Sequence, residues 1–151
     1  MPQSLVQVYT HIVYSTKNRV PHLTSKQHRD DLYAYFRGIF ENFDSPIVEI
    51  GGVADHVHIL CRLSSGVAIK HLLQEQKRDT SKHVKTFGRE LSEFYWQSGY
   101  GAFSVSPSHV PQLRTYIRNQ EEHHKTESFQ DEFRRLLKKY NIEYDERYVW
   151  D

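Results

Sequence analysis

Strand-like and helix-like patterns follow one another along this chain in a defined order. Runs of β-branched and aromatic residues predict strands at residues 6–14, 46–50, 53–63 and 102–106. Apolar residues at helical spacing predict a helix after the first strand, another after the third, and two more that begin near residues 108 and 129. This is the order of the split βαβ arrangement of ferredoxin-like folds. We therefore expect an α+β fold, with a four-stranded antiparallel sheet, helices on one face and additional C-terminal helices.

Single residues predict where some of these elements begin and end. Thr24 or Ser25 can cap the first helix, and Ser108 can cap the third. The pair Gly51-Gly52 predicts a tight turn between the second and third strands. Because a ferredoxin-like fold hosts many activities, the function has to be inferred from a site.

Length and composition limit the class of protein. The 151 residues can form one core, so we expect one domain over residues 1–151. The 20 Lys and Arg residues nearly balance the 19 Asp and Glu residues, and the net charge of +1 does not indicate a nucleic-acid binder. The single cysteine, Cys61, excludes an internal disulfide framework. Without a signal-peptide pattern or an apolar run of about 20 residues, the chain is expected to be cytoplasmic.

The segment DHVHIL, residues 55–60, carries the most informative motif. On a strand, side chains two positions apart share a face, so His56 and His58 are expected to project together and outward. Two adjacent imidazoles can hold one metal ion. With 10 histidines in the chain, the same spacing also arises by chance, and a purely structural role stays open.

Tyr116 and Gln120 form a second candidate pair. Four residues apart on a helix, their side chains face the same way, at the edge of the apolar stripe that contains Ile117. A tyrosine at the rim of a core, with its hydroxyl reaching solvent, has the same pattern. The pair does not indicate catalysis by itself.

Basic residues form a row on the second helix, at Arg78, Lys82, Lys85 and Arg89. Their spacing places them on one helix face, along which the phosphates of DNA could run. An ordinary solvated face has the same pattern. The pair His123-His124 lies in a charged run and is also expected to be solvated.

Taken together, these motifs resemble the single-tyrosine transposases of the smallest bacterial insertion sequences. These are His-hydrophobic-His (HUH) nucleases of the transposase A type, and their relatives include transposases associated with repeated extragenic palindromes. The resemblance extends from HIVYSTKNR near the start to Trp150, and its motifs occur in the family's order and at its approximate spacing. The segments that carry it are GGVADHVHIL, FYWQSGYGAFSVSPSHV and YIRNQEEHHKTESFQDEF.

The resemblance implies a role for individual residues. His56 and His58 would be metal ligands, Gln120 the third protein ligand, and Tyr116 the nucleophile on the same helix. The implied activity is cleavage and rejoining of single-stranded DNA through a 5′-phosphotyrosine intermediate, with Mg²⁺ or Mn²⁺ as cofactor. The resemblance also implies a homodimer in which the tyrosine helix of one subunit can complete the site of the other, and DNA substrates folded into hairpins.

Two other functions are less compatible with these residues. A non-catalytic nucleic-acid-binding module on the same sheet would need aromatic side chains on its central strands, where residues 53–63 carry histidines instead. A two-histidine phosphoesterase needs two His-x-Ser/Thr motifs on strands. The segment His22-Leu23-Thr24 precedes a helix, and DHVHIL does not supply the second motif. The binding module stays the alternative.

Overall fold

The computed structural model describes residues 2–151, and at its centre lies a four-stranded antiparallel sheet with the order β2-β3-β1-β4. The strands are β1 (Val8–Ser15), β2 (Ile47–Val53), β3 (His56–Leu63) and β4 (Gly101–Val105). The α-helices are α1 (Lys26–Asn42), α2 (Ile69–Lys85), α3 (Val110–Arg118), α4 (Gln120–His123) and α5 (Phe129–Lys139). The predicted α+β architecture is confirmed. None of the helices in this described part of the chain is both long and apolar enough to cross a membrane.

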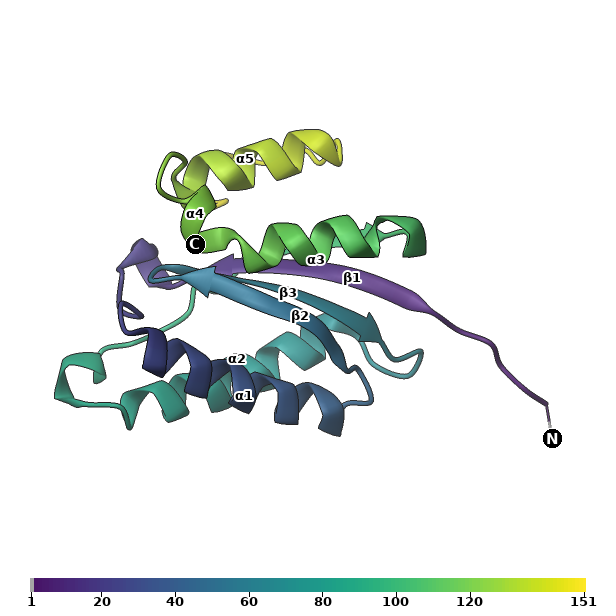
Figure 1. Ribbon diagram of the computed structural model, residues 1–151, viewed down its shortest axis with the longest axis horizontal. Coiled ribbons are helices and arrows are strands. Elements are labelled where there is room, and N and C mark those ends of the chain that lie inside the picture. Colours follow the sequence, from purple (N-terminus) through teal and green to yellow (C-terminus); the bar gives the residue numbers. More distant parts are fainter. Residues whose placement is uncertain (1) are drawn as a thin grey trace.

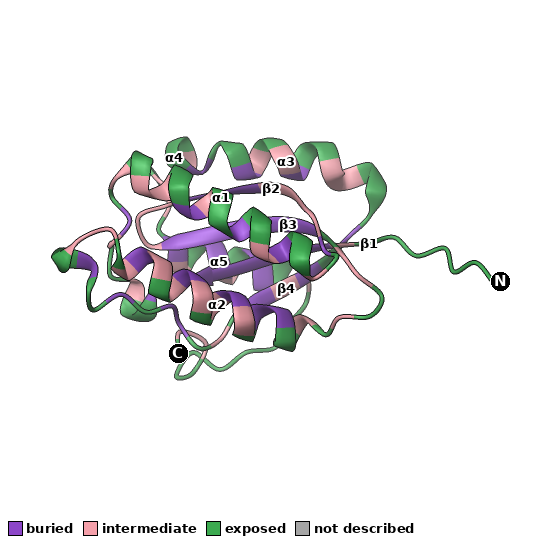
Figure 2. Cartoon of the chain, turned by 90° about the horizontal axis from the view of Figure 1, so that it is seen from below, coloured by how far each residue is buried: buried purple, intermediate pink, exposed green. Residues whose placement is uncertain are grey.

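The helices form layers on opposite faces of the sheet (Figure 1). Helices α1 and α2 cover one face, and α3, α4 and α5 lie over the other. The central strands β1 and β3 are therefore buried from both sides, as Figure 2 shows. Along β3 the side chains alternate between the layers: Ile59 and Cys61 pack toward α1 and α2, whereas His58 and Leu60 face the C-terminal helices.

The predicted glycine turn is wrong, because Gly51 and Gly52 lie inside β2 and pair with His58 and Val57 of β3. The chain turns after Val53 instead, at residues 54 and 55. These glycines permit other backbone segments to approach the strand closely. A Cβ atom on Gly51 would lie 2.5 Å from the carbonyl oxygen of Ile117 in α3. The lack of a side chain at Gly51 therefore lets α3 rest directly on the sheet.

One of the two predicted helix caps is confirmed. The Oγ atom of Ser25 accepts a hydrogen bond from the backbone N–H of His28 at 3.2 Å and caps α1. Ser108 caps no helix. It lies within a short 3-10 turn, Pro107–His109, and α3 begins only after this turn. Proline suits the first position of such a turn because its φ is already helical and it has no N–H to satisfy.

Candidate metal centre and tyrosine site

The two histidines of β3 lie on the sheet face that the C-terminal helices cover. The side chains of His56 and His58 are fully buried, so the expectation that they face outward is wrong. Each has a partner at Nδ1: Oδ1 of Asp55 lies 2.7 Å from His56, and Nε2 of His11 lies 2.9 Å from His58. Both Nε2 atoms therefore point toward the space beneath α5.

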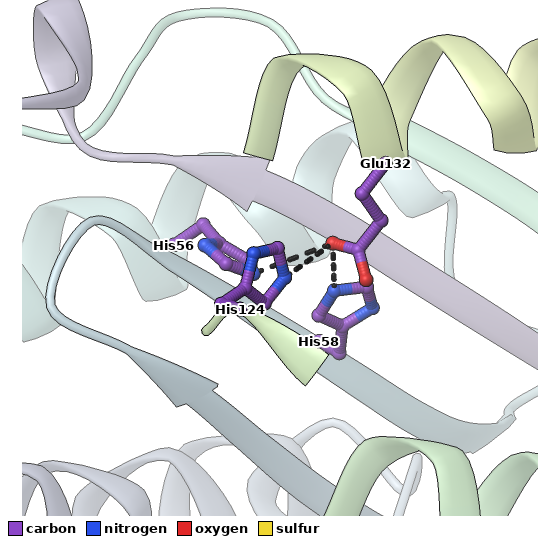
Figure 3. A group of neighbouring side chains, drawn as sticks. All are labelled: His56, His58, His124 and Glu132. Atoms are coloured by element: carbon purple, nitrogen blue, oxygen red, sulfur yellow. Dashed lines mark hydrogen bonds and ion pairs between the residues drawn. The ribbon is translucent and has the colours of Figure 1, made fainter. Parts of the chain in front are cut away.

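A carboxylate from α5 occupies the centre of this space (Figure 3). Oε1 of Glu132 lies 2.8 Å from Nε2 of His58, 3.1 Å from Nε2 of His124 and 3.4 Å from Nε2 of His56. Glu132 is fully buried, and the side chain of His124 is 8% exposed. Three imidazoles therefore converge on a single carboxylate oxygen.

Tyr116 and Gln120 also reach this cluster. The hydroxyl of Tyr116 donates a hydrogen bond to Oε2 of Glu132, and its ring centroid lies 5.8 Å from that of His58. Oε1 of Gln120 lies 3.0 Å from Nε2 of His56, and Nε2 of Gln120 donates to Oε2 of Glu132 at 3.1 Å. The structure thus brings together His56, His58, Tyr116 and Gln120, as their proposed roles require.

Tyr116 and Gln120 do not share one helix, although the sequence predicts that they do. Helix α3 ends at Arg118, Asn119 leaves the helical conformation with φ −94° and ψ 20°, and α4 begins at Gln120. The break turns the backbone at Asn119. Gln120 consequently enters the site from the side of His56, whereas Tyr116 enters from the side of His58.

The electrostatics of the cluster favour a carboxylate surrounded by positive charge. Burial would raise the pKa of Glu132, but the charge of His58 and hydrogen bonds from the three imidazoles hold the pKa well below its usual range. Burial alone would lower the pKa of His56, yet Asp55 and Glu132 raise it to about 9. Burial lowers the pKa of His58. Burial and the nearby Glu132 carboxylate raise the pKa of Tyr116, so its phenol is neutral without further activation.

The donors of this cluster fit a divalent metal ion. One ligand atom from each of His56, His58, His124 and Glu132 lies within 4.8 Å of the others. Four nitrogen and oxygen donors that hold an ion tetrahedrally stand about 3.3–3.6 Å apart, and the separations from Oε1 of Glu132 are 2.8–3.4 Å. The amide oxygen of Gln120 lies beside them. The site can therefore hold a divalent ion.

Sequence reasoning missed two members of the cluster, Glu132 and His124. The expectation that His124 is solvated is wrong, since its ring packs against His56 with centroids 4.3 Å apart. A signal for Glu132 was present. It lies three residues after Phe129 and four before Leu136, which places a carboxylate on the apolar face of α5. A charge on such a face indicates a buried partner.

The predicted basic row is only partly correct. Arg78, Lys82 and Lys85 line a groove of about 840 Å³ along α2, together with the rings of Tyr95 and Tyr100. The residues that line this groove include no Asp or Glu. Helix α2, however, ends at Lys85. Arg89 lies in a separate 3-10 turn, Arg89–Leu91, and is not part of the groove.

The side chains of this groove are held in place to different degrees. Nζ of Lys85 donates to the carbonyl oxygen of Phe94 at 2.6 Å and lies 4.0 Å from the centroid of the Tyr95 ring. Lys82 is exposed and makes no such contact, and Arg78 pairs with Glu75 and Asp79. Helix α2, which lines the groove, lies on the face of the sheet opposite the C-terminal helices (Figure 1).

Comparison with known proteins agrees with this description. A family model described as "Transposase IS200 like" matches residues 4–120. The chain is similar in structure to a candidate transposase from Deinococcus radiodurans R1, with a TM-score of 0.62 and 19% identity, over 80% of this chain and 95% of that one. It is also similar to a REP-associated tyrosine transposase bound to a REP hairpin, with a TM-score of 0.60 and 13% identity, over 82% of this chain and 73% of that one. No curated protein matches the chain.

Proposed function

Because the chain belongs to the family of IS200-like transposases, we propose that it cuts and rejoins single-stranded DNA through a covalent bond between Tyr116 and DNA, with the help of a metal ion. One observation carries the residue assignment. The hydroxyl of Tyr116 and the imidazoles of His56 and His58 converge on the same buried carboxylate. A nucleophile beside a set of metal donors is the arrangement that attack on a phosphodiester requires.

In the proposed first step, the phenolic oxygen of Tyr116 attacks phosphorus. A phosphotyrosine bond forms with the 5′ side of the cut, the bond from phosphorus to the 3′ oxygen breaks, and the 3′ oxygen leaves as a hydroxyl group. In the second step a 3′-hydroxyl attacks the phosphotyrosine and restores a phosphodiester. Each step exchanges one phosphate ester for another, so the cycle needs no nucleotide cofactor.

A tyrosine with a pKa near 10 needs help to attack as phenolate. Nη2 of Arg135 donates to the hydroxyl oxygen of Tyr116 at 2.9 Å, and this contact works to lower the pKa of the phenol. Oε2 of Glu132 accepts the hydrogen bond of the hydroxyl and so fixes its orientation. Arg135 thus supplies a cation for the phenolate, and Glu132 holds the hydroxyl in place.

His56, His58 and Gln120 would hold the ion in this proposal. A bound divalent ion would bind the scissile phosphate and stabilise the charge that develops on it. The support for these ligands is their placement: the ring nitrogens of both histidines and the amide oxygen of Gln120 face the same buried space.

For DNA binding, we propose the groove along α2. Its basic residues Arg78, Lys82 and Lys85 can neutralise phosphates, and the exposed rings of Tyr95 and Tyr100 offer faces on which bases can stack. The REP-associated transposase with a similar fold binds a REP hairpin. We extend to this chain a preference for single-stranded DNA folded into hairpins.

The homodimer that the family resemblance implies stays a prediction. Within one chain Tyr116 already contacts the cluster that contains His58, so the site described here does not need a residue from a second copy. Sedimentation of the full chain with and without hairpin DNA would measure its oligomeric state.

The test is a search for the covalent intermediate. The full chain is incubated with Mn²⁺ and a single-stranded oligonucleotide that carries a hairpin from the DNA flanking its gene. We expect a protein–DNA adduct that survives denaturation, that disappears on chelation of the metal, and that mass spectrometry maps to Tyr116. An adduct on another residue would contradict the role of Tyr116. Tight binding without any adduct would favour the non-catalytic binding module.

A further inference from the structure

Two of the four donors in the cluster come from a part of the chain that the family match does not reach. The match ends at residue 120, whereas His124 follows α4 and Glu132 lies in α5. Both side chains nevertheless lie against the histidines of β3, as Figure 3 shows; Glu132 is fully buried, and His124 is 8% exposed. The C-terminal segment therefore contributes two possible ligand side chains to the site and also covers it.

All three imidazoles are oriented with Nε2 toward the centre of the cluster. At Nδ1, His56 meets Asp55, His58 meets His11, and His124 meets the backbone carbonyl oxygen of Glu127 at 2.6 Å. A carbonyl can only accept a hydrogen bond, so Nδ1 of His124 carries a proton, and its Nε2 faces Oε1 of Glu132 at 3.1 Å. An outer partner at one ring nitrogen, with the other nitrogen directed at the place of the ion, is the usual arrangement of a metal-binding histidine.

Glu132 has an unusual set of partners for a fully buried carboxylate. Within residues 2–151, only histidines form ion pairs with it, and no lysine or arginine does. Its two oxygens are also divided: Oε1 faces the three imidazoles, and Oε2 faces Tyr116 and Gln120. A buried carboxylate is costly unless it is paired with positive charge, and a divalent ion would provide that charge.

We propose that His124 and Glu132 are metal ligands, so that the site is a centre of three histidines and one carboxylate that selects a transition-metal ion over Mg²⁺. This inference rests on the proposed function only in placing the metal at the same site. Mg²⁺ prefers oxygen donors and retains several water molecules, whereas imidazole nitrogen favours transition metals. Glu132 would join the ion to Tyr116, because its second oxygen holds the tyrosine hydroxyl.

The experiment measures metal binding without DNA. The metal-free full chain is titrated separately with Mn²⁺, Co²⁺ and Mg²⁺ by calorimetry. We expect one site that binds Mn²⁺ and Co²⁺ at least tenfold more tightly than Mg²⁺. Glu132→Gln and His124→Gln should each weaken Mn²⁺ binding by at least tenfold, since removal even of an outer partner costs about 10–100-fold.

Two matched controls separate ligand loss from general effects. Asp131→Asn makes the same change of charge on the exposed side of α5, and His71→Gln replaces an exposed histidine of α2. Both should bind Mn²⁺ as the unmodified chain does. Thermal melting without metal reports whether each variant folds. If Glu132→Gln does not fold, the Mn²⁺ affinity of His124→Gln is the deciding measurement, because the side chain of His124 lies at the edge of the cluster.

Three results would overturn the inference. Unchanged Mn²⁺ affinity in both variants would exclude His124 and Glu132 as ligands, while His56, His58 and Gln120 could still hold the ion of the proposed function. Equal affinity for Mg²⁺ and Mn²⁺ would contradict the selectivity. The absence of any Mn²⁺ binding by the unmodified chain would contradict both this inference and the metal in the proposed function.

Discussion

Nε2 of His11 lies 2.9 Å from Nδ1 of His58, and the two buried rings stack with centroids 5.1 Å apart. Burial, together with the nearby His58, holds the pKa of His11 well below its ordinary value, so His11 is neutral and its Nε2 can accept a hydrogen bond. With an ion bound at Nε2, His58 would carry its proton at Nδ1 and donate it to Nε2 of His11. A histidine on β1 thus sets the orientation and tautomer of a histidine on β3.

This contact predicts a difference between two substitutions of His11. His11→Leu removes the acceptor and should weaken Mn²⁺ binding by about 10–100-fold, because His58 loses its outer partner. His11→Gln keeps an acceptor oxygen and should retain more of the affinity. Calorimetric titration of both variants measures the difference. Equal Mn²⁺ affinity of the His11→Leu variant, the His11→Gln variant and the unmodified chain would show that His11 does not orient His58.

Tyr116→Phe removes one oxygen and leaves the ring in place. Packing beside His58 should barely change, so the melting temperature and the affinity for hairpin DNA should stay close to those of the unmodified chain. The covalent adduct and strand transfer should both be lost. An exposed tyrosine outside both sites supplies the control, since Tyr148→Phe should still form the adduct. An adduct formed by Tyr116→Phe would refute the assignment.

Replacement of Lys82 and Lys85 by Ala should weaken binding of single-stranded DNA and flatten its dependence on salt. Each lost phosphate contact changes the slope of log K against log salt by about 0.7. Binding measured between low and physiological salt gives this slope. Lys26→Ala, on α1 and paired with Asp30, serves as control and should leave the slope unchanged. An unchanged slope in the double variant would make this row an ordinary solvated face.

Gly51→Ala should destabilise the fold by about 1–3 kcal/mol, because a Cβ there meets the carbonyl oxygen of Ile117 at 2.5 Å and pushes α3 from the sheet. Gly38→Ala is the matched control. A Cβ at this exposed helical position meets nothing within 4 Å, and the change should stabilise α1 by about 0.5–1 kcal/mol. Chemical denaturation measures both effects. Tolerance of Ala at position 51 would contradict the close approach of α3.

The metal-free protein should lose stability as the pH rises from about 6.5 to about 9. The pKa of His56 is 6.5 in its ordinary state and about 9 in the folded chain, so its protonated form stabilises the fold fully below the first value. That contribution disappears as the pH passes the second. Asp55→Asn should make the decline shallower, and Asp131→Asn should not. The measurement is the melting temperature of the protein in the presence of a chelator, at pH values across this range.

The sheet and the histidine motif were predictable because both depend on local spacing. Alternation along residues 55–60 suffices to place His56 and His58 on one face. The glycine pair shows the limit of this reasoning. Gly51 and Gly52 have the composition of a turn, and only the position of α3, more than 50 residues later in the chain, explains why they lie in a strand.

The site itself was predictable only in part, because its members come from distant segments. Tyr116 and Gln120 both reach the cluster, but the break at Asn119 places them on two helices, which their spacing of four residues does not predict. Glu132 has no sequence motif, and its position on the apolar face of α5 indicates burial without naming the partner. The end of helix α2 was not predictable from the sequence either. Arg89 was therefore expected on the same helix face as Arg78, although α2 ends at Lys85.

The contribution of α5 has a consequence for how the protein is made. His58 and Glu132 meet across 74 positions of the chain, and every strand of the sheet is translated before α5. Chains grow from the N-terminus at about 5–20 residues per second, so a nascent chain can form its sheet and histidine pair before the carboxylate exists. The complete centre forms only after translation has passed Glu132. A chain released early would therefore have the scaffold of the protein without the carboxylate that its histidines and tyrosine share.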